Sequence, residues 1–243
     1  MVTAAGGNLI DAPGTPEAAW RAWPGIGQLP AVDTSGWASA VVVAAHPDDE
    51  VLGAGGIIAA LAAQGARLRL VALTDGEASH PHEAASIRAR RVAETTAALA
   101  ALEARQAEVI RLALPDSGLT AYEDDITARL RQLAAGFDVC LAPWDSDAHP
   151  DHEVAGRAAR VARRGEATLW YPVWMWHWAR PDDRRVPWHA AVRAPLPRSA
   201  AARKRRAISC FASQLEHRTP RTPPVLPAGI VAHFTRDAEV FFR

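Results

Sequence analysis

Short apolar runs alternate along the chain with longer stretches of helical periodicity. Residues 38–45 (ASAVVVAA) are apolar, with β-branched residues at their centre, which is typical of a strand buried on both faces. Similar runs predict further strands at residues 67–74, 107–112, 137–143 and 167–171, and weaker patterns predict strands at 189–194 and 238–242. Between them, helical periods predict helices at residues 50–64, 83–105, 124–135, 153–164 and 200–214.

The alternation of strands with helices of ten or more residues predicts βαβ units. We therefore expect an α/β, Rossmann-like fold of three layers, with a mostly parallel sheet and helices on both faces. Residues 38–243 are expected to form this single domain. Residues 1–37, rich in Gly, Pro and Ala, contain Trp20, Trp23 and Trp37 and are expected to form an N-terminal arm on its surface.

Length and charge narrow the class of protein. The chain has 243 residues, which suits one large domain, and its 27 basic and 27 acidic residues cancel. A zero net charge argues against a nucleic-acid or anionic-membrane partner. The first twenty residues lack a basic start and an apolar run, and no stretch approaches the ~18 apolar residues of a membrane span. We expect a cytoplasmic protein, and its Arg-rich, Ala-rich composition is typical of a bacterial genome rich in G and C.

The cysteines, the tryptophans and one basic run each indicate or exclude a kind of site. Cys140 and Cys210 both lie in apolar segments, which excludes a disulfide framework and a zinc site built from Cys. Nine Trp residues are present, and the run at 170–178 (WYPVWMWHW) predicts a buried aromatic cluster or a wall that stacks on a sugar ring. The basic run at 203–206 (RKRR) is interpreted as the solvated face of a helix.

Two similar polar turns follow buried strands. Residues 46–50 (HPDDE) follow the first predicted strand, and residues 149–153 (HPDHE) come shortly after the fourth, each just before a helix. The carboxyl ends of parallel strands meet at one edge of a sheet, where open α/β proteins bind their ligands. We therefore expect both turns to face one crevice.

Imidazole and carboxylate groups without thiolates suit a catalytic zinc site, which uses three protein ligands and leaves a fourth position to water. His46 and His152 with one aspartate would supply such a set, and the residues alone do not choose between Asp48 and Asp49. The aspartate that remains would be a general base, and His149 would stabilise the developing oxyanion.

Both turns and the glycines that follow the first one also have simpler interpretations. Aspartates before a helix are ordinary N-caps that complement the helix dipole, which accounts equally well for a single such turn. Two turns after buried strands, one of them with two histidines, favour the metal site. The glycines at 53–56 (GAGG) do not make a dinucleotide-binding loop, because the sixth position of GxGxxG is Ile58 and the run lies inside a helix. They are interpreted as close packing behind the metal.

The segments AHPDDEVLGAGG and HPDHEVAG resemble the two motifs of the PIG-L/LmbE-like deacetylases, which include the N-acetylglucosaminyl-phosphatidylinositol deacetylase. Supporting similarities occur in LTDGEAS, RVAE, LPDSGL, APWDSDAHPDH, YPVWMWHW, CFASQ and EVFFR. Together they span most of residues 38–243. The resemblance implies a zinc-dependent hydrolase that removes an acyl group, usually acetyl, from an amino sugar or a related small amine.

Residue by residue, the resemblance implies one Zn²⁺ ion per chain, held by His46, Asp49 and His152. It implies that Asp48 is the general base, that His149 polarises the carbonyl or acts as an acid, and that Asp151 orients His149.

The resemblance also indicates substrate contacts at Arg91 and Asp116. Asp75, at the end of the second predicted strand, is a further candidate because it would point into the crevice. The alternative for these three residues is an exposed helix arginine and ordinary turn aspartates.

The expected partner is a small N-acyl amino-sugar-type substrate, and a homo-oligomer is compatible with the sequence. The alternative function is a catalytically idle domain that keeps the fold and binds a sugar or a partner. The intact pair of His-Pro-Asp turns argues against that alternative.

Overall fold

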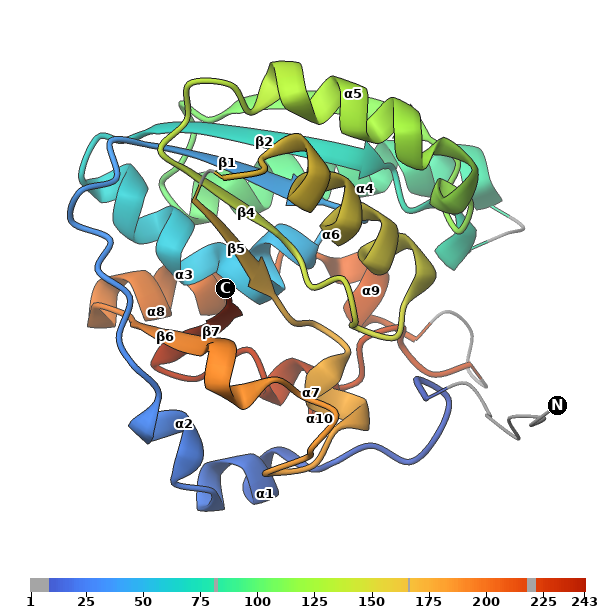
Figure 1. Ribbon diagram of the computed structural model, residues 1–243. Coiled ribbons are helices and arrows are strands. Elements are labelled where there is room, and N and C mark those ends of the chain that lie inside the picture. Colours follow the sequence, from blue (N-terminus) through green and yellow to red (C-terminus); the bar gives the residue numbers. More distant parts are fainter. Residues whose placement is uncertain (1–8, 81–82, 166, 218–221) are drawn as a thin grey trace, which may run out of the picture.

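The computed structural model describes residues 9–80, 83–165, 167–217 and 222–243 (Figure 1). Within these residues a single sheet of seven strands runs in the order β3-β2-β1-β4-β5-β7-β6. The first five strands are parallel, and β7 is antiparallel to β5 and β6. The strands are β1 (Ser39–Ala44), β2 (Arg67–Thr74), β3 (Glu108–Leu114), β4 (Val139–Pro143), β5 (Thr168–Tyr171), β6 (Ala191–Pro195) and β7 (Ala238–Phe242).

Helices cover both faces of this sheet, which confirms the predicted single α/β domain (Figure 1). Helices α3, α4 and α8 lie on one face, and α5 and α6 lie on the other. Their bounds are α3 (Asp49–Ala63), α4 (Ala84–Ala101), α5 (Glu123–Leu133), α6 (Pro150–Ala162) and α8 (Arg198–Ile208). Shorter helices are α1 (Glu17–Ala22), α2 (Gly25–Gln28), α7 (Met175–Trp178), α9 (Ala212–Leu215) and α10 (Ala228–Ala232).

Burial follows the position of each strand in the sheet. Every residue of the central strands β1 and β4 is buried, as expected for strands covered by helices on both faces. Strand β3 lies at an edge and alternates between exposed and more buried positions. The apolar runs in the sequence therefore mark the centre of the sheet.

The two polar turns emerge side by side. Strand β1 pairs with β2 on one side and with β4 on the other, so the order of the strands reverses between β1 and β4. Ligands of open α/β sheets bind at such a switch point, outside the carboxyl ends of the strands. Helix α3 starts directly after the first turn, and α6 starts within the second.

Tryptophans anchor the N-terminal segment to the body of the domain. Trp20 is fully buried, and its indole N–H donates to the carbonyl oxygen of Trp176 at 2.8 Å. Its ring packs edge-on against the ring of Trp176, with centroids 5.0 Å apart, and Trp23 packs similarly on Trp188 at 4.7 Å. This cluster explains much of the tryptophan excess. The division at residue 38 stays a prediction.

The interpretation of residues 203–206 as a solvated face is wrong for one residue. Arg205 and Arg206 are exposed, but Lys204 is buried and faces α3. Gly55 provides the space, because a Cβ atom there would lie only 3.3 Å from Cγ of Lys204. In the part of the chain that the structure describes, no helix combines the length and apolar character of a membrane span.

Candidate metal and active site

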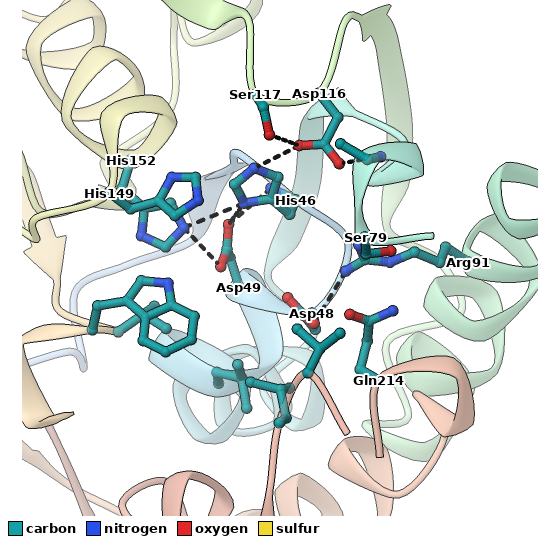
Figure 2. Close-up of a pocket in the computed structure, with 16 residues that line it drawn as sticks. His46, Asp48, Asp49, Ser79, Arg91, Asp116, Ser117, His149, His152 and Gln214 are labelled. Carbon is teal, nitrogen blue, oxygen red and sulfur yellow. Dashed lines mark hydrogen bonds and ion pairs between the residues drawn. The ribbon is translucent and has the colours of Figure 1, made fainter. Parts of the chain in front are cut away.

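A cavity of about 190 Å³ opens at the carboxyl ends of β1 and β4. Its polar lining includes His46, Asp48 and Asp49 of the first turn and His149 and His152 of the second, with Arg91 and Asp116 (Figure 2). Apolar residues from several elements complete the wall, namely Leu52, Val173, Trp174, Val225 and Leu226. The structure therefore brings the two turns, far apart in the sequence, to a single cavity.

Three donor groups converge within this cavity. Nδ1 of His46 lies 3.4 Å from Oδ2 of Asp49, and Nε2 of His152 lies 3.2 Å from Oδ1 of Asp49. The same nitrogens of His46 and His152 are 3.3 Å apart. Zinc–ligand distances of about 2.0–2.2 Å in a tetrahedron place the ligand atoms about 3.3–3.6 Å from one another. The spacing of the two histidine nitrogens, and of each nitrogen from one of the two Asp49 oxygens, therefore fits the ligands of a zinc ion.

Two other triads are also compact. Ligand atoms of His46, His149 and His152 lie within 4.8 Å of one another, and so do those of His46, Asp116 and Asp151. The distances between these groups therefore do not by themselves identify the metal ligands. The carboxylates that contact each histidine ring give a further criterion, because they fix which ring nitrogen is free to bind a metal.

Asp147 holds the ring of His152. Its Oδ2 lies 2.8 Å from Nδ1 of His152, and its carboxylate also accepts the backbone N–H groups of Val173, Trp174 and Met175. Asp147 is fully buried. A carboxylate at Nδ1 keeps the proton there and leaves the lone pair of Nε2 for a metal. Asp147 lies within the segment APWDSDAHPDH, but the sequence pattern gives it no separate signal.

Two carboxylates hold the ring of His46 in a similar way. Nε2 of His46 lies 3.2 Å from both Asp116 and Asp151, so that Nδ1 faces Asp49. The carboxylate of Asp151 also accepts the backbone N–H groups of Ser117 and Leu119. The structure thus places the Asp151 carboxylate against His46 rather than against His149, the residue it was expected to orient.

His149 is the N-cap of α6, and Nδ1 of its ring accepts the backbone N–H of Asp151 at 3.3 Å. This bond puts the ring proton on Nε2. Burial lowers the pKa of His149 to about 3, and the positive charges of His152 and His46 act in the same direction. His149 is therefore a neutral hydrogen-bond donor at neutral pH.

Asp48 has an unusual backbone and a shifted pKa. Its φ of 122° lies in a region that residues other than glycine rarely adopt and that concentrates at functional sites. Burial raises its pKa to about 7, the Arg91 guanidinium opposes this rise, and the Asp49 charge adds to it. Oδ2 of Asp48 lies 3.1 Å from Nη2 of Arg91. The carboxyl group of Asp48 is therefore able to exchange a proton near neutral pH.

The three candidate substrate contacts occupy different positions. Arg91 lines the cavity and donates to Asp48 and to the carbonyl oxygens of Gly76 and Pro47. Asp116 also lines it and accepts the backbone N–H of Ala78. Asp75 is absent from the described lining and instead pairs with Arg111 on β3 at 2.5 Å. The structure thus brings Arg91 and Asp116 to the cavity but not Asp75.

The far end of the chain also contributes to the cavity. Gln214 of α9 is buried and lies on the same side as Asp48 and Arg91 (Figure 2). The only signal for it in the sequence was the segment CFASQ, which carried no chemistry by itself.

The glycines of α3 allow close packing behind the site, as interpreted from the sequence. A Cβ atom on Gly53 would lie 2.0 Å from the ring of Tyr171, and one on Gly56 would lie 2.3 Å from the side chain of Leu196.

The fold and the site together define an α/β protein with a cavity at the sheet edge whose His and Asp groups could hold a metal ion. Residues 41–163, about half of the chain, match the family described as PIG-L: GlcNAc-PI de-N-acetylase. This match includes both His-Pro-Asp turns. The chain therefore belongs to the PIG-L/LmbE-like deacetylase family, which confirms the resemblance inferred from the motifs.

A relative in sequence is the 1D-myo-inositol 2-acetamido-2-deoxy-alpha-D-glucopyranoside deacetylase of Rhodococcus erythropolis (strain PR4). It is 28% identical over 191 residues, which cover 67% of this chain and 64% of the relative. The aligned part thus spans somewhat less than two thirds of that protein's length.

Solved structures share the fold. The N,N'-diacetylchitobiose deacetylase of Pyrococcus horikoshii has a TM-score of 0.57 and 19% identity, over 85% of this chain and 82% of that one. The 4-carboxy-2-hydroxymuconate hydratase of Pseudomonas putida KT2440 has a TM-score of 0.50 and 24% identity, over 72% and 79%. Because proteins named for different reactions share this architecture, the residues of the site must carry the functional argument.

Proposed function

We propose that the protein is a zinc-dependent N-deacetylase that hydrolyses the N-acetyl, or another N-acyl, group of an amino sugar or related small amide. The observation that carries this proposal is the group formed by His46, Asp49 and His152 beside Asp48, whose donor atoms contact one another at 3.2–3.4 Å. Relatives named as deacetylases of amino sugars support the substrate class. One zinc ion per chain would be held by His46, Asp49 and His152.

When bound, zinc would polarise the amide carbonyl and lower the pKa of water toward neutrality. Asp48 would accept the proton of the attacking water and return it to the leaving amine. Its pKa of about 7 suits both transfers, because an acid–base catalyst works best near the operating pH. Arg91 would hold the Asp48 carboxylate in place through its ion pair.

His149 would donate its Nε2 proton in a hydrogen bond to the carbonyl oxygen as negative charge develops there. Its low pKa favours this role over that of a proton donor. Asp151 supports the site twice, through its carboxylate on His46 and its backbone N–H on His149. Products of the reaction would be acetate and a free amine.

The idle binding domain is the rival function. Such a domain would not require the two ring-holding arrangements, Asp147 on His152 and Asp116 with Asp151 on His46, because they orient nitrogens toward one point. Asp75 as a substrate contact, the cytoplasmic location and a homo-oligomer stay predictions.

The test combines metal analysis with substitution of the base. We expect the purified protein to contain one zinc ion per chain and to release acetate from at least one member of a panel of N-acetyl amino sugars. Chelation should abolish this activity and added zinc should restore it. Asp48→Asn should keep the zinc and lower kcat by about 10²–10⁴-fold, whereas Asp124→Asn on α5 should not affect activity. A fully active Asp48→Asn protein, or a wild-type protein that hydrolyses no member of the panel, contradicts the proposal.

A further inference from the structure

Lys204, the only lysine of the chain, forms a buried ion pair behind the cavity. Lys204 lies on α8 and Glu239 on β7, and Nζ lies 2.6 Å from Oε1 of Glu239. Both side chains are at most 4% exposed. Neither residue lines the proposed active-site cavity.

The ion pair contacts the backbone of α3 in the middle of the helix. Nζ of Lys204 donates to the carbonyl oxygen of Leu52 at 2.7 Å. The Glu239 carboxylate accepts the N–H of Gly56 at 2.7 Å and that of Ile57 at 2.9 Å. In a regular α-helix, the N–H of Gly56 bonds to the carbonyl of Leu52. Lys204 therefore binds the acceptor of that helical hydrogen bond, and Glu239 binds its donor.

This contact lies one turn from the catalytic carboxylates. Helix α3 begins at Asp49, and the N–H groups of Val51 and Leu52 both bond to the carbonyl oxygen of Asp48. Leu52 thus closes the first turn, and its side chain lines the cavity. A group that holds the Leu52 carbonyl also holds the turn that carries Asp48 and Asp49.

The local sequence accommodates this contact. A Cβ atom on Gly55 would approach Cγ of Lys204 to 3.3 Å, which is closer than most Cβ contacts, so glycine lets the lysine stem lie against the helix. On the other side of the same turn, Gly53 admits the ring of Tyr171, whose hydroxyl donates to the carbonyl oxygen of Val43 on β1. The first turn of α3 is therefore held from two sides.

Stability alone does not explain a buried ion pair at this point, because apolar residues of similar volume often serve equally well. The polar contacts to the backbone give it a role. The ammonium group donates to the carbonyl oxygen of Leu52, and the carboxylate accepts the N–H groups of Gly56 and Ile57, which apolar residues could not do. We propose that Lys204 and Glu239 are positioning residues, which set the first turn of α3 so that Asp49 meets His46 and His152 at metal-binding distance and Asp48 lies beside them.

This inference rests on the proposed metal site. Its central test is the double variant Lys204→Met/Glu239→Gln, which removes both charges and leaves no lone buried charge. Zinc affinity is measured by competition with a chromophoric chelator, and kinetics are measured at saturating zinc. We expect the zinc dissociation constant to rise by about 10–100-fold, as is usual when support of a metal ligand is lost. We expect kcat to fall, while KM stays within about a factor of two of the wild-type value.

Arg163→Met is the matched control. Arg163 is another buried cation that donates to backbone carbonyls, those of Ala134 and Phe137, at the opposite edge of the sheet. We expect its loss to lower the melting temperature without changing zinc affinity. A double variant with wild-type zinc affinity and kcat overturns the inference, and so does an Arg163→Met protein with the same loss of zinc affinity.

Glu239→Asp provides a second variant if the double variant does not fold. It keeps both charges but shortens the reach of the carboxylate toward Gly56 and Ile57. Weaker zinc binding by this folded variant supports the inference, and unchanged binding overturns it. A wild-type protein that binds zinc but hydrolyses no N-acetyl compound contradicts the deacetylase proposal alone, because the zinc measurement tests the positioning role without a substrate.

Discussion

Replacement of Asp147 by asparagine tests how the structure holds His152. Four N–H groups converge on the Asp147 carboxylate, those of the His152 ring and of the backbone at Val173, Trp174 and Met175. Asparagine has nearly the same shape but offers one acceptor oxygen and one NH₂ group. In its better orientation, the oxygen faces His152 and Trp174, and the NH₂ group faces the N–H of Met175.

The magnitude follows from this count of donors. At least one buried hydrogen bond is lost, which costs about 1–3 kcal/mol in the free energy of unfolding. For a chain of this size, each kcal/mol lowers the melting temperature by about 2–4 °C. The NH₂ group is repelled by the N–H of Met175, which displaces the side chain and weakens its hold on the His152 ring. We therefore expect the zinc dissociation constant to rise by about 10–100-fold.

The assay measures the melting temperature and, by chelator competition, zinc affinity for Asp147→Asn beside Asp138→Asn. Asp138 also accepts a backbone N–H and a hydroxyl, both from Ser39, but at the amino-terminal edge of the sheet. We expect Asp138→Asn to leave zinc affinity unchanged. Wild-type zinc affinity in Asp147→Asn, or an equal loss in both variants, would refute the assignment of Asp147 as the group that orients His152.

Three further predictions concern the arm, the base and the packing behind the site. Burial would raise the pKa of Glu17, but hydrogen bonds from His233 and Arg236 lower it to about 2, so its ionised form stabilises the fold above the ordinary pKa of 4.5. Glu17→Gln should lower the free energy of unfolding by about 1–2 kcal/mol at pH 7, and this difference from the wild type should disappear as pH falls from 4.5 through 2. Urea unfolding at several pH values measures it. Arg91→Met removes the charge that opposes the raised pKa of Asp48, so the acid limb of the kcat/KM profile should move to higher pH; a shift to lower pH contradicts the proposed base. Gly53→Ala places a Cβ atom against the Tyr171 ring and should lower the free energy of unfolding by about 1–3 kcal/mol, measured by thermal unfolding. Gly27→Ala, whose Cβ atom would meet no atom within 4 Å, should leave this free energy almost unchanged.

The sequence by itself determined the fold class and the edge of the sheet where the site lies. The apolar runs of β1 and β4 predicted central, doubly covered strands, because only such strands have no exposed face. Because parallel strands end at the same edge of a sheet, the turns after β1 and β4 then had to lie close together. The residue types in those turns, His and Asp without Cys, limited the chemistry to a His/Asp metal site.

Tertiary structure alone decided which group supports which. Asp147 on His152, Asp151 on His46 rather than His149, and the ion pair of Lys204 with Glu239 each depend on the direction of a side chain. A run such as RKRR predicts exposure from composition, yet Lys204 is buried because Gly55 on α3 leaves room for it. Gln214 likewise reaches the cavity from the far end of the chain. Hydrophobic periodicity records which face of an element is covered, but it does not record which residues of distant segments meet there, and those pairings set the electrostatics of the site.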